Sequence, residues 1–120
     1  MMCAEPPTHH DDVTLNQQEY VCRVLDWYRC TPGTLGRVRS HDRVVAAELY
    51  RRKILPSVVE SALILAAARR TLRAEDAPPL APVRSLAYFL PVVEEVIVTP
   101  LAPDYVRYLR SKLAKYAART

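Results

Sequence analysis

The chain has 120 residues, a length that predicts one domain, and half of its residues are apolar, enough for one hydrophobic core. Ten prolines against two glycines and a formal net charge of +4 suit a helical, moderately basic protein. No apolar run approaches about 18 residues, and none follows a basic N-terminal segment, which argues against a membrane span and a signal peptide. We therefore expect a cytoplasmic domain.

Residues 1–13 are acidic and contain no Lys or Arg. Such a composition predicts a flexible acidic tail, followed by a single helical domain over residues 14–120. Within the tail, the HHDD run at 9–12 with Cys3 upstream contains metal-ligating residue types. Adjacent ligands in a flexible segment have no fixed geometry, so we predict no metal site there.

The first helix is expected to begin after Thr14, which forms a capping box pattern with Gln17. Apolar residues then recur at a spacing of three to four as far as Tyr28, which predicts one buried stripe. Trp27, the only tryptophan, is interpreted as a core anchor, with stacking on a nucleic-acid base as the alternative. The Thr-Pro-Gly sequence at 31–33 ends the helix.

Cysteine usage agrees with a reducing compartment. The chain has three cysteines and no CxxC pair. On one helix, Cys22 and Cys30 would lie about 12 Å apart along the axis, too far for a disulfide.

The loop at 31–43 holds both glycines of the chain and three arginines, Arg37, Arg39 and Arg43. Backbone N–H groups and guanidinium groups in such a loop can bind phosphate. The loop is not a P-loop, because the closing Lys-Ser/Thr pair is absent. A plain connection with solvated arginines is the alternative.

The next two helices are predicted over Asp42–Lys53 and Ser57–Leu72, with Pro56 suited to the first turn of the second one. Both end in cations, a placement that the helix dipole explains only in part. The cations are Arg51, Arg52, Lys53, Arg69, Arg70 and Arg73. The helix over 57–72 is apolar on most of its circumference, so it is expected at the centre of the fold or in an interface. Its first turns offer few base-reading side chains, which disfavours a DNA-reading helix-turn-helix.

A proline-rich connector at 74–82 precedes a fourth helix over Val83–Val98, in which Pro91 predicts a kink or break near residues 87–90. A strand over 92–98 was the alternative, because β-branched residues are frequent there. The last helix is predicted over Pro103–Ala118. Its polar face carries Arg107, Arg110, Lys112 and Lys115, with Tyr108 among them. Such a face suits nucleic acid, an anionic membrane surface or an acidic partner, or is simply solvated.

No constellation for catalysis is present in the sequence. The paired carboxylates at 11–12, 75–76 and 94–95 are direct neighbours, whose side chains point about 100° apart on a helix. No Ser or Cys has an evident activating partner. We expect a protein that is not an enzyme and that has no catalytic residues, cofactor or metal.

The order of elements resembles a known class of proteins. A first helix with Trp near its end, a helix–Pro–helix unit closing in Ala-Arg-Arg, and the SLAYFLPVVEEV segment are similar to small helical modules of replication-initiation and mobile-element proteins. Among these, the DnaD-like helical domain of helicase-loading proteins is the nearest. The resemblance covers Leu15–Val98 and implies a module that associates with nucleic acid and docks onto protein.

The sequence thus predicts an all-α fold, a compact bundle of four to five helices with the segments 57–72 and 83–98 at its centre. Its predicted role is non-catalytic nucleic-acid binding, to DNA or RNA, as an accessory module of a nucleoprotein assembly. The alternative is a protein-interaction or oligomerisation subunit that uses the same two central helices. The candidate phosphate-binding residues are Arg37, Arg39, Arg43, Arg51, Arg52, Lys53, Arg69, Arg70, Arg73, Arg107, Arg110, Lys112 and Lys115.

Overall fold

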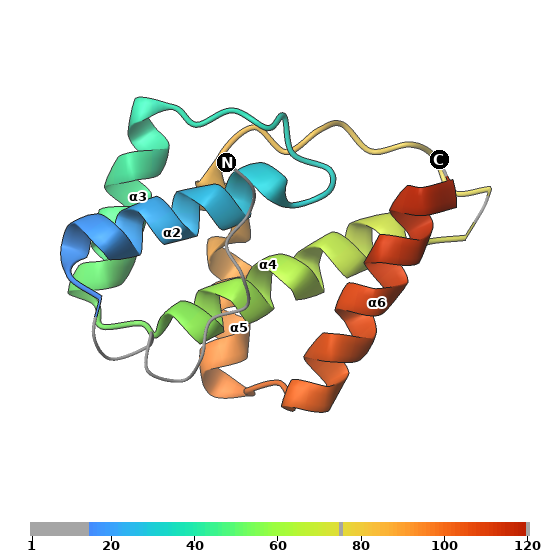
Figure 1. Cartoon of the computed structure of the whole chain (residues 1–120). Helices are drawn as coiled ribbons and strands as arrows, with labels where there is room; N and C mark the ends of the chain where they lie inside the picture. The colour runs from blue at the N-terminus through green and yellow to red at the C-terminus, as the bar shows by residue number, and fades with distance from the viewer. Residues whose placement is uncertain (1–14, 75, 120) are drawn as a thin grey trace.

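A computed structural model describes residues 15–74 and 76–119 (Figure 1). The described chain forms five α-helices and one 3-10 turn. In order these are α2 (Gln17–Cys30), α3 (Ser40–Arg51), α4 (Pro56–Thr71), η1 (Leu86–Phe89), α5 (Leu90–Val98) and α6 (Pro103–Arg119). The predicted all-α bundle is confirmed. The predicted acidic tail at 1–13 lies outside the described residues.

The first helix begins later than its sequence indicated, because a different capping box is used. The Asn16 side chain accepts a hydrogen bond from the Glu19 backbone N–H at 2.8 Å. The Glu19 carboxylate accepts one from the Asn16 N–H at 3.1 Å. The pair satisfies two backbone donors that the first turn of a helix leaves open. Helix α2 therefore starts at Gln17 with Asn16 as its N-cap, and Thr14 of the predicted Thr14–Gln17 box lies outside the described residues.

The break between α3 and α4 is a Schellman turn with a lysine at its left-handed position. Lys53 has a φ of 61°, and its N–H donates to the Tyr50 carbonyl, while the Ile54 N–H donates to the Leu49 carbonyl. This pattern ends a helix and buries the residue after the turn, here Ile54. Pro56 then opens α4 in its first turn, as predicted.

Helix α4 is the centre of the bundle, as its sequence predicted. It packs against α2, α5, α6 and η1 (Figure 1). Val59, Ala62 and Leu63 are all buried, and so are residues on the other sides of the helix. This explains why its sequence is apolar on most of its circumference. Helix α5 is more peripheral than expected, since Ile97 and Val98 are exposed.

The predicted helix over Val83–Val98 is only partly correct. Residues 83–85 are extended, η1 follows, and the α-helix proper begins at Leu90, so that Pro91 occupies its first turn. Proline lacks an N–H and is tolerated where no intrahelical bond is needed, which is the reason for the break at this point. The β-branched residues at 92–98 are helical, so the strand alternative is wrong.

The loop after α2 is fastened to the connector before η1. The Val83 N–H donates to the Gly33 carbonyl at 2.8 Å, and the Leu35 N–H donates to the Val83 carbonyl at 3.0 Å. Figure 1 shows the two segments running side by side along one edge of the molecule. Gly33 has a φ of +91°, and a Cβ there would approach the Arg70 guanidinium to 3.4 Å. A glycine therefore suits this position in both respects.

Asp42, in the first turn of α3, links the end of the loop at Arg39 to the start of η1 at Leu86. Its side chain is completely buried. One carboxylate oxygen accepts from the Arg39 N–H at 2.8 Å and so caps α3, while the other accepts from the Leu86 N–H at 2.9 Å. A buried carboxylate requires such partners, and here they hold η1 against the start of α3.

None of the helices in the described part of the chain has both the length and the apolar character needed to cross a membrane.

Candidate nucleic-acid interface

The structure divides the predicted phosphate-binding cations into two classes. In the first class, a carboxylate lies within ion-pair distance. Its members are Arg51 with Glu48, Arg52 with Glu94, Arg69 with Glu95, Arg107 with Asp104, and Arg110 with Glu60. These arginines have their charge compensated inside the chain, so they attract a phosphate less than their sequence suggested.

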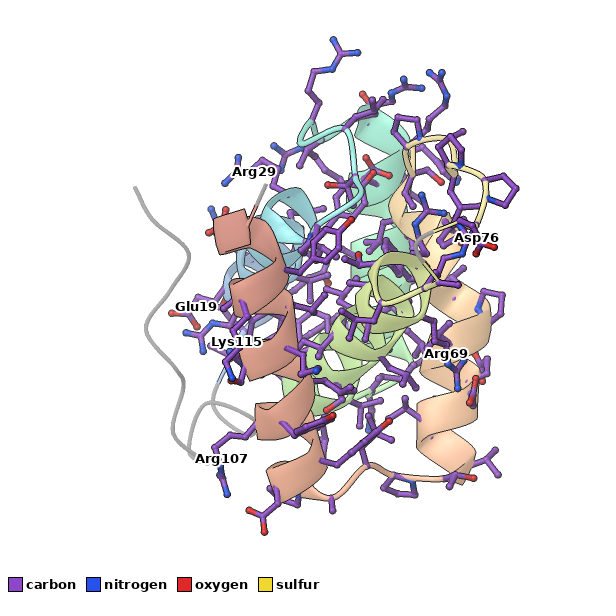
Figure 2. All side chains as sticks on the ribbon, turned by 90° about the vertical axis from the view of Figure 1, so that its right-hand side faces the viewer. Glu19, Arg29, Arg69, Asp76, Arg107 and Lys115 are labelled. Carbon is purple, nitrogen blue, oxygen red and sulfur yellow. The ribbon has the colours of Figure 1, made fainter. Side chains whose placement is uncertain are left out.

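Two of these pairs hold α5 in place. The Arg52 guanidinium donates to both carboxylate oxygens of Glu94, at 2.6 and 3.2 Å. The Arg69 guanidinium does the same with Glu95, at 2.9 and 2.5 Å. Figure 2 shows Arg69 between α4 and α5. Bidentate pairs of this kind fix both side chains, so the two arginines fasten α5 to the ends of α3 and α4.

The same pairs make stability depend on acid. Hydrogen bonds from Arg52 and Arg69 lower the pKa of Glu94 and Glu95, respectively, below the ordinary value of 4.5. A carboxyl group with a lowered pKa in the folded state stabilises the fold above its ordinary pKa, and this contribution is lost as the pH falls through the lowered value. We expect the urea concentration at the unfolding midpoint to decrease as the pH is lowered below 4.5. In the Glu94→Gln/Glu95→Gln variant this decrease should be less steep. Parallel pH curves for the two proteins would contradict this.

In the second class, no described carboxylate lies within ion-pair distance of the cation. Three of its members line an open groove of about 990 Å³. The groove, here called the basic groove, lies between the end of α4, the connector and the second half of α6. Its lining comprises Pro32, Gly33, Arg70, Thr71, Leu72, Arg73, Ala74, Ala77, Pro78, Pro79, Leu80, Lys112, Leu113 and Tyr116. The lining includes Arg70, Arg73 and Lys112 but, among the described residues, no Asp or Glu. Among its described residues, the groove therefore carries positive charge without a compensating carboxylate.

Arg70 and Arg73 are held by groups that carry no charge. The Arg70 guanidinium donates to the Ala81 carbonyl at 2.6 Å and to the Tyr88 hydroxyl at 3.1 Å, and it lies over the Tyr88 ring. The Arg73 guanidinium donates to the Pro78 carbonyl at 2.8 Å. A carbonyl positions a guanidinium without cancelling its net charge. Both arginines are thus fixed and still cationic, as an anion site requires.

A second uncompensated set lies on the loop after α2, in the first turns of α3 and on the segment before η1. Arg37, Arg39, Arg43 and Arg84 are exposed, and within described residues none of them has a carboxylate at ion-pair distance. We call these four arginines the loop surface. Arg84 is brought beside the loop by the pairing of Val83 with residues 33–35. The start of the same loop, at Pro32 and Gly33, also lines the basic groove.

The remaining candidates are placed apart from the basic groove. Lys53 occupies the turn between α3 and α4. Figure 2 shows Lys115 on the side of α6 that faces away from α5. Neither lysine has a carboxylate partner among the described residues, but neither lines the groove.

Two alternative readings from the sequence can be judged by burial. Trp27 is 8% exposed and belongs to the hydrophobic core, so the core-anchor interpretation is confirmed. Helix α4 is covered by its neighbours, so it is not free to enter a DNA groove as a recognition helix.

Across residues 15–74 and 76–119, no group of His, Cys, Asp and Glu is arranged to hold a metal ion.

Several groove residues were not among the sequence candidates. Leu72, Leu80 and Tyr116 form its apolar walls because the connector turns back toward α6. The sequence indicated these groove residues only through the tyrosines and lysines that lie close together along α6.

Comparisons with protein-family models, with curated proteins and with solved structures found no match.

Proposed function

We propose that this chain is a non-catalytic nucleic-acid-binding module of a larger nucleoprotein assembly. Its contacts would be made to the phosphate backbone by the cations of the basic groove and the loop surface. The observation that carries the proposal is the separation of cations into compensated and uncompensated sets. Arg70, Arg73 and Lys112 line one groove, and the described lining of that groove contains no Asp or Glu.

This arrangement increases the affinity for a polyanion in two ways. Each phosphate neutralised releases counterions, so affinity depends on cations that are not already paired. Arg70 and Arg73 have also lost part of their side-chain freedom to the carbonyls that hold them. Less entropy is then lost when they bind a phosphate.

The test compares two variants that remove the same charge from different places. Arg73→Gln/Lys112→Gln removes two cations from the basic groove. Arg51→Gln/Arg107→Gln removes two exposed cations whose carboxylate partners lie three residues away. We expect the groove variant to weaken binding to labelled DNA and RNA by anisotropy, and to reduce the slope of log affinity against log salt by about 2.

The matched control variant should bind almost as the wild type does. Exposed ion pairs contribute little to stability, so it should also remain folded. Equal losses in the two variants would mean that only the total charge matters, which would contradict a site in the groove. Absence of binding to any nucleic acid at low salt would overturn the proposed function.

One observation favours protein interaction as the second candidate. At the end of α5, Val98 is 81% exposed and Ile97 is 41% exposed, beside the turn into α6. Apolar side chains grouped in this way are typical of contact surfaces. A mass that rises with concentration in size exclusion, without nucleic acid, would favour this function.

A further inference from the structure

Helix α6 carries a row of exposed tyrosines that leads into the basic groove. Tyr105, Tyr108 and Tyr116 are 46%, 55% and 45% exposed. With Lys112 they recur at intervals of three, four and four residues, so they share one face of the helix. Leu109 and Leu113, on the neighbouring face, are buried and hold α6 on the bundle. The tyrosines are therefore not needed as the buried anchor of this helix.

The rings in this row are already arranged in a stacked and cation-linked manner. Tyr105 and Tyr108 stack with their centroids 6.2 Å apart and their planes at 20°. The Lys112 ammonium lies 6.0 Å from the centroid of the Tyr108 ring. Lys112 and Tyr116 in turn line the basic groove. The exposed rings and the uncompensated Lys112 thus form one row from Tyr105 to Tyr116, which we call the tyrosine track.

We propose that the tyrosine track binds single-stranded nucleic acid, with bases stacked on Tyr108 and Tyr116 and phosphates placed at Lys112 and in the basic groove. This inference rests on the proposed function and names its substrate class. The bases of a duplex stack on one another, so their faces are closed to a side chain, whereas an unpaired base offers its face to an aromatic ring. Aromatic rings beside a positively charged groove are typical of sequence-tolerant single-strand binding.

The spacing along α6 agrees with two separate base sites. Tyr108 and Tyr116 are eight residues apart, which corresponds to about 12 Å along the helix axis. Bases in a stacked strand repeat at about 3.4 Å, so the two rings cannot share one base. Lys112 lies midway between the rings in sequence, where the backbone of a strand crossing from one to the other would pass. Its charge is not compensated by any described carboxylate.

The decisive variants exchange the rings while keeping the charge. Tyr108→Leu/Tyr116→Leu removes both aromatic faces, and Tyr108→Phe/Tyr116→Phe keeps them and removes only the hydroxyls. Each is measured on the full chain by anisotropy with labelled 20-nucleotide single-stranded DNA, single-stranded RNA and duplex DNA. We expect the leucine variant to lose about tenfold in single-strand affinity for each ring. Its duplex affinity should not change, and the phenylalanine variant should bind as the wild type does.

The outcomes separate this inference from the proposed function. Unchanged single-strand binding by the leucine variant would overturn the tyrosine track, while the proposed function would stand if Arg73→Gln/Lys112→Gln still weakened binding. Equal losses in the leucine and phenylalanine variants would also overturn it, because stacking does not need the hydroxyl. If the leucine variant changed only self-association in size exclusion, the track would be a protein contact instead. No binding of nucleic acid by the wild type would overturn both.

Discussion

Asp42→Ala is expected to destabilise the fold by about 2–4 kcal/mol, because the substitution leaves the N–H groups of Arg39 and Leu86 without an acceptor. The Leu86 N–H is buried and has no ready access to water in the folded chain. The change also removes a side chain that both caps α3 and fastens η1 to it. We expect a fall of about 1–3 M in the urea midpoint, followed by circular dichroism at 222 nm.

Two further variants show whether the hydrogen bonds are responsible. Asp42→Asn keeps the size and one oxygen but turns an amide donor toward a backbone donor, so its midpoint should fall between those of Asp42→Ala and the wild type. Asp76→Ala removes an equal charge from an exposed position on the connector and should leave the midpoint almost unchanged (Figure 2). Similar midpoints for Asp42→Ala and Asp76→Ala would mean that the buried carboxylate is not a structural link.

Phe89→Ala is the second large effect that we expect, at about 3–5 kcal/mol of lost stability. Phe89 is 1% exposed at the junction of η1 and α5. Its ring meets Tyr28 and Tyr88 edge-on, with centroids 6.1 and 5.3 Å away. The substitution removes buried apolar area and both aromatic contacts, and leaves a cavity against the fully buried Tyr28. The melting temperature should fall by about 10–20 °C.

A graded series keeps this prediction testable even if Phe89→Ala does not fold. Phe89→Leu retains most of the apolar volume and should lose clearly less stability than Phe89→Ala. Val98→Ala removes apolar atoms from a residue that is 81% exposed and should leave the melting temperature nearly unchanged. A Phe89→Leu variant as unstable as Phe89→Ala would mean that the aromatic contacts, rather than the filled volume, dominate at this site.

The order and type of the helices could be predicted from the sequence wherever they depend on residues close together in the chain. Pro56 opens α4 and Pro103 opens α6, as expected from a residue that suits the first turn. The central place of α4 also followed from its sequence, because a helix that is apolar on most sides must be covered on most sides. The start of α2 was missed by two residues, because the Asn16–Glu19 pair, which makes the observed capping box, is as acceptable by sequence as the Thr14–Gln17 pair that was predicted.

The candidate interface was harder to predict from the sequence than the helices were. A cluster of arginines in sequence says nothing of where the carboxylates lie in space. Arg52 is compensated by Glu94, which is 42 residues away in sequence, and Arg69 by Glu95, which is 26 residues away. Arg70, a direct neighbour of Arg69, instead reaches a carbonyl on the connector and keeps its charge. Adjacent arginines on a helix point in different directions, so only the packing determines which of them has a carboxylate beside it.

The helical class, the proline-bounded helices and the amphipathic character of α6 could be predicted without the structure, because each depends on propensity and periodicity within a few turns. Three features came from long-range packing instead: the extended course of residues 83–85, the burial of Asp42, and the basic groove between α4, the connector and α6. These features depend on partners from distant segments, such as Val83 with Gly33 and Leu86 with Asp42. Long-range pairs of this kind form only when the whole chain is packed.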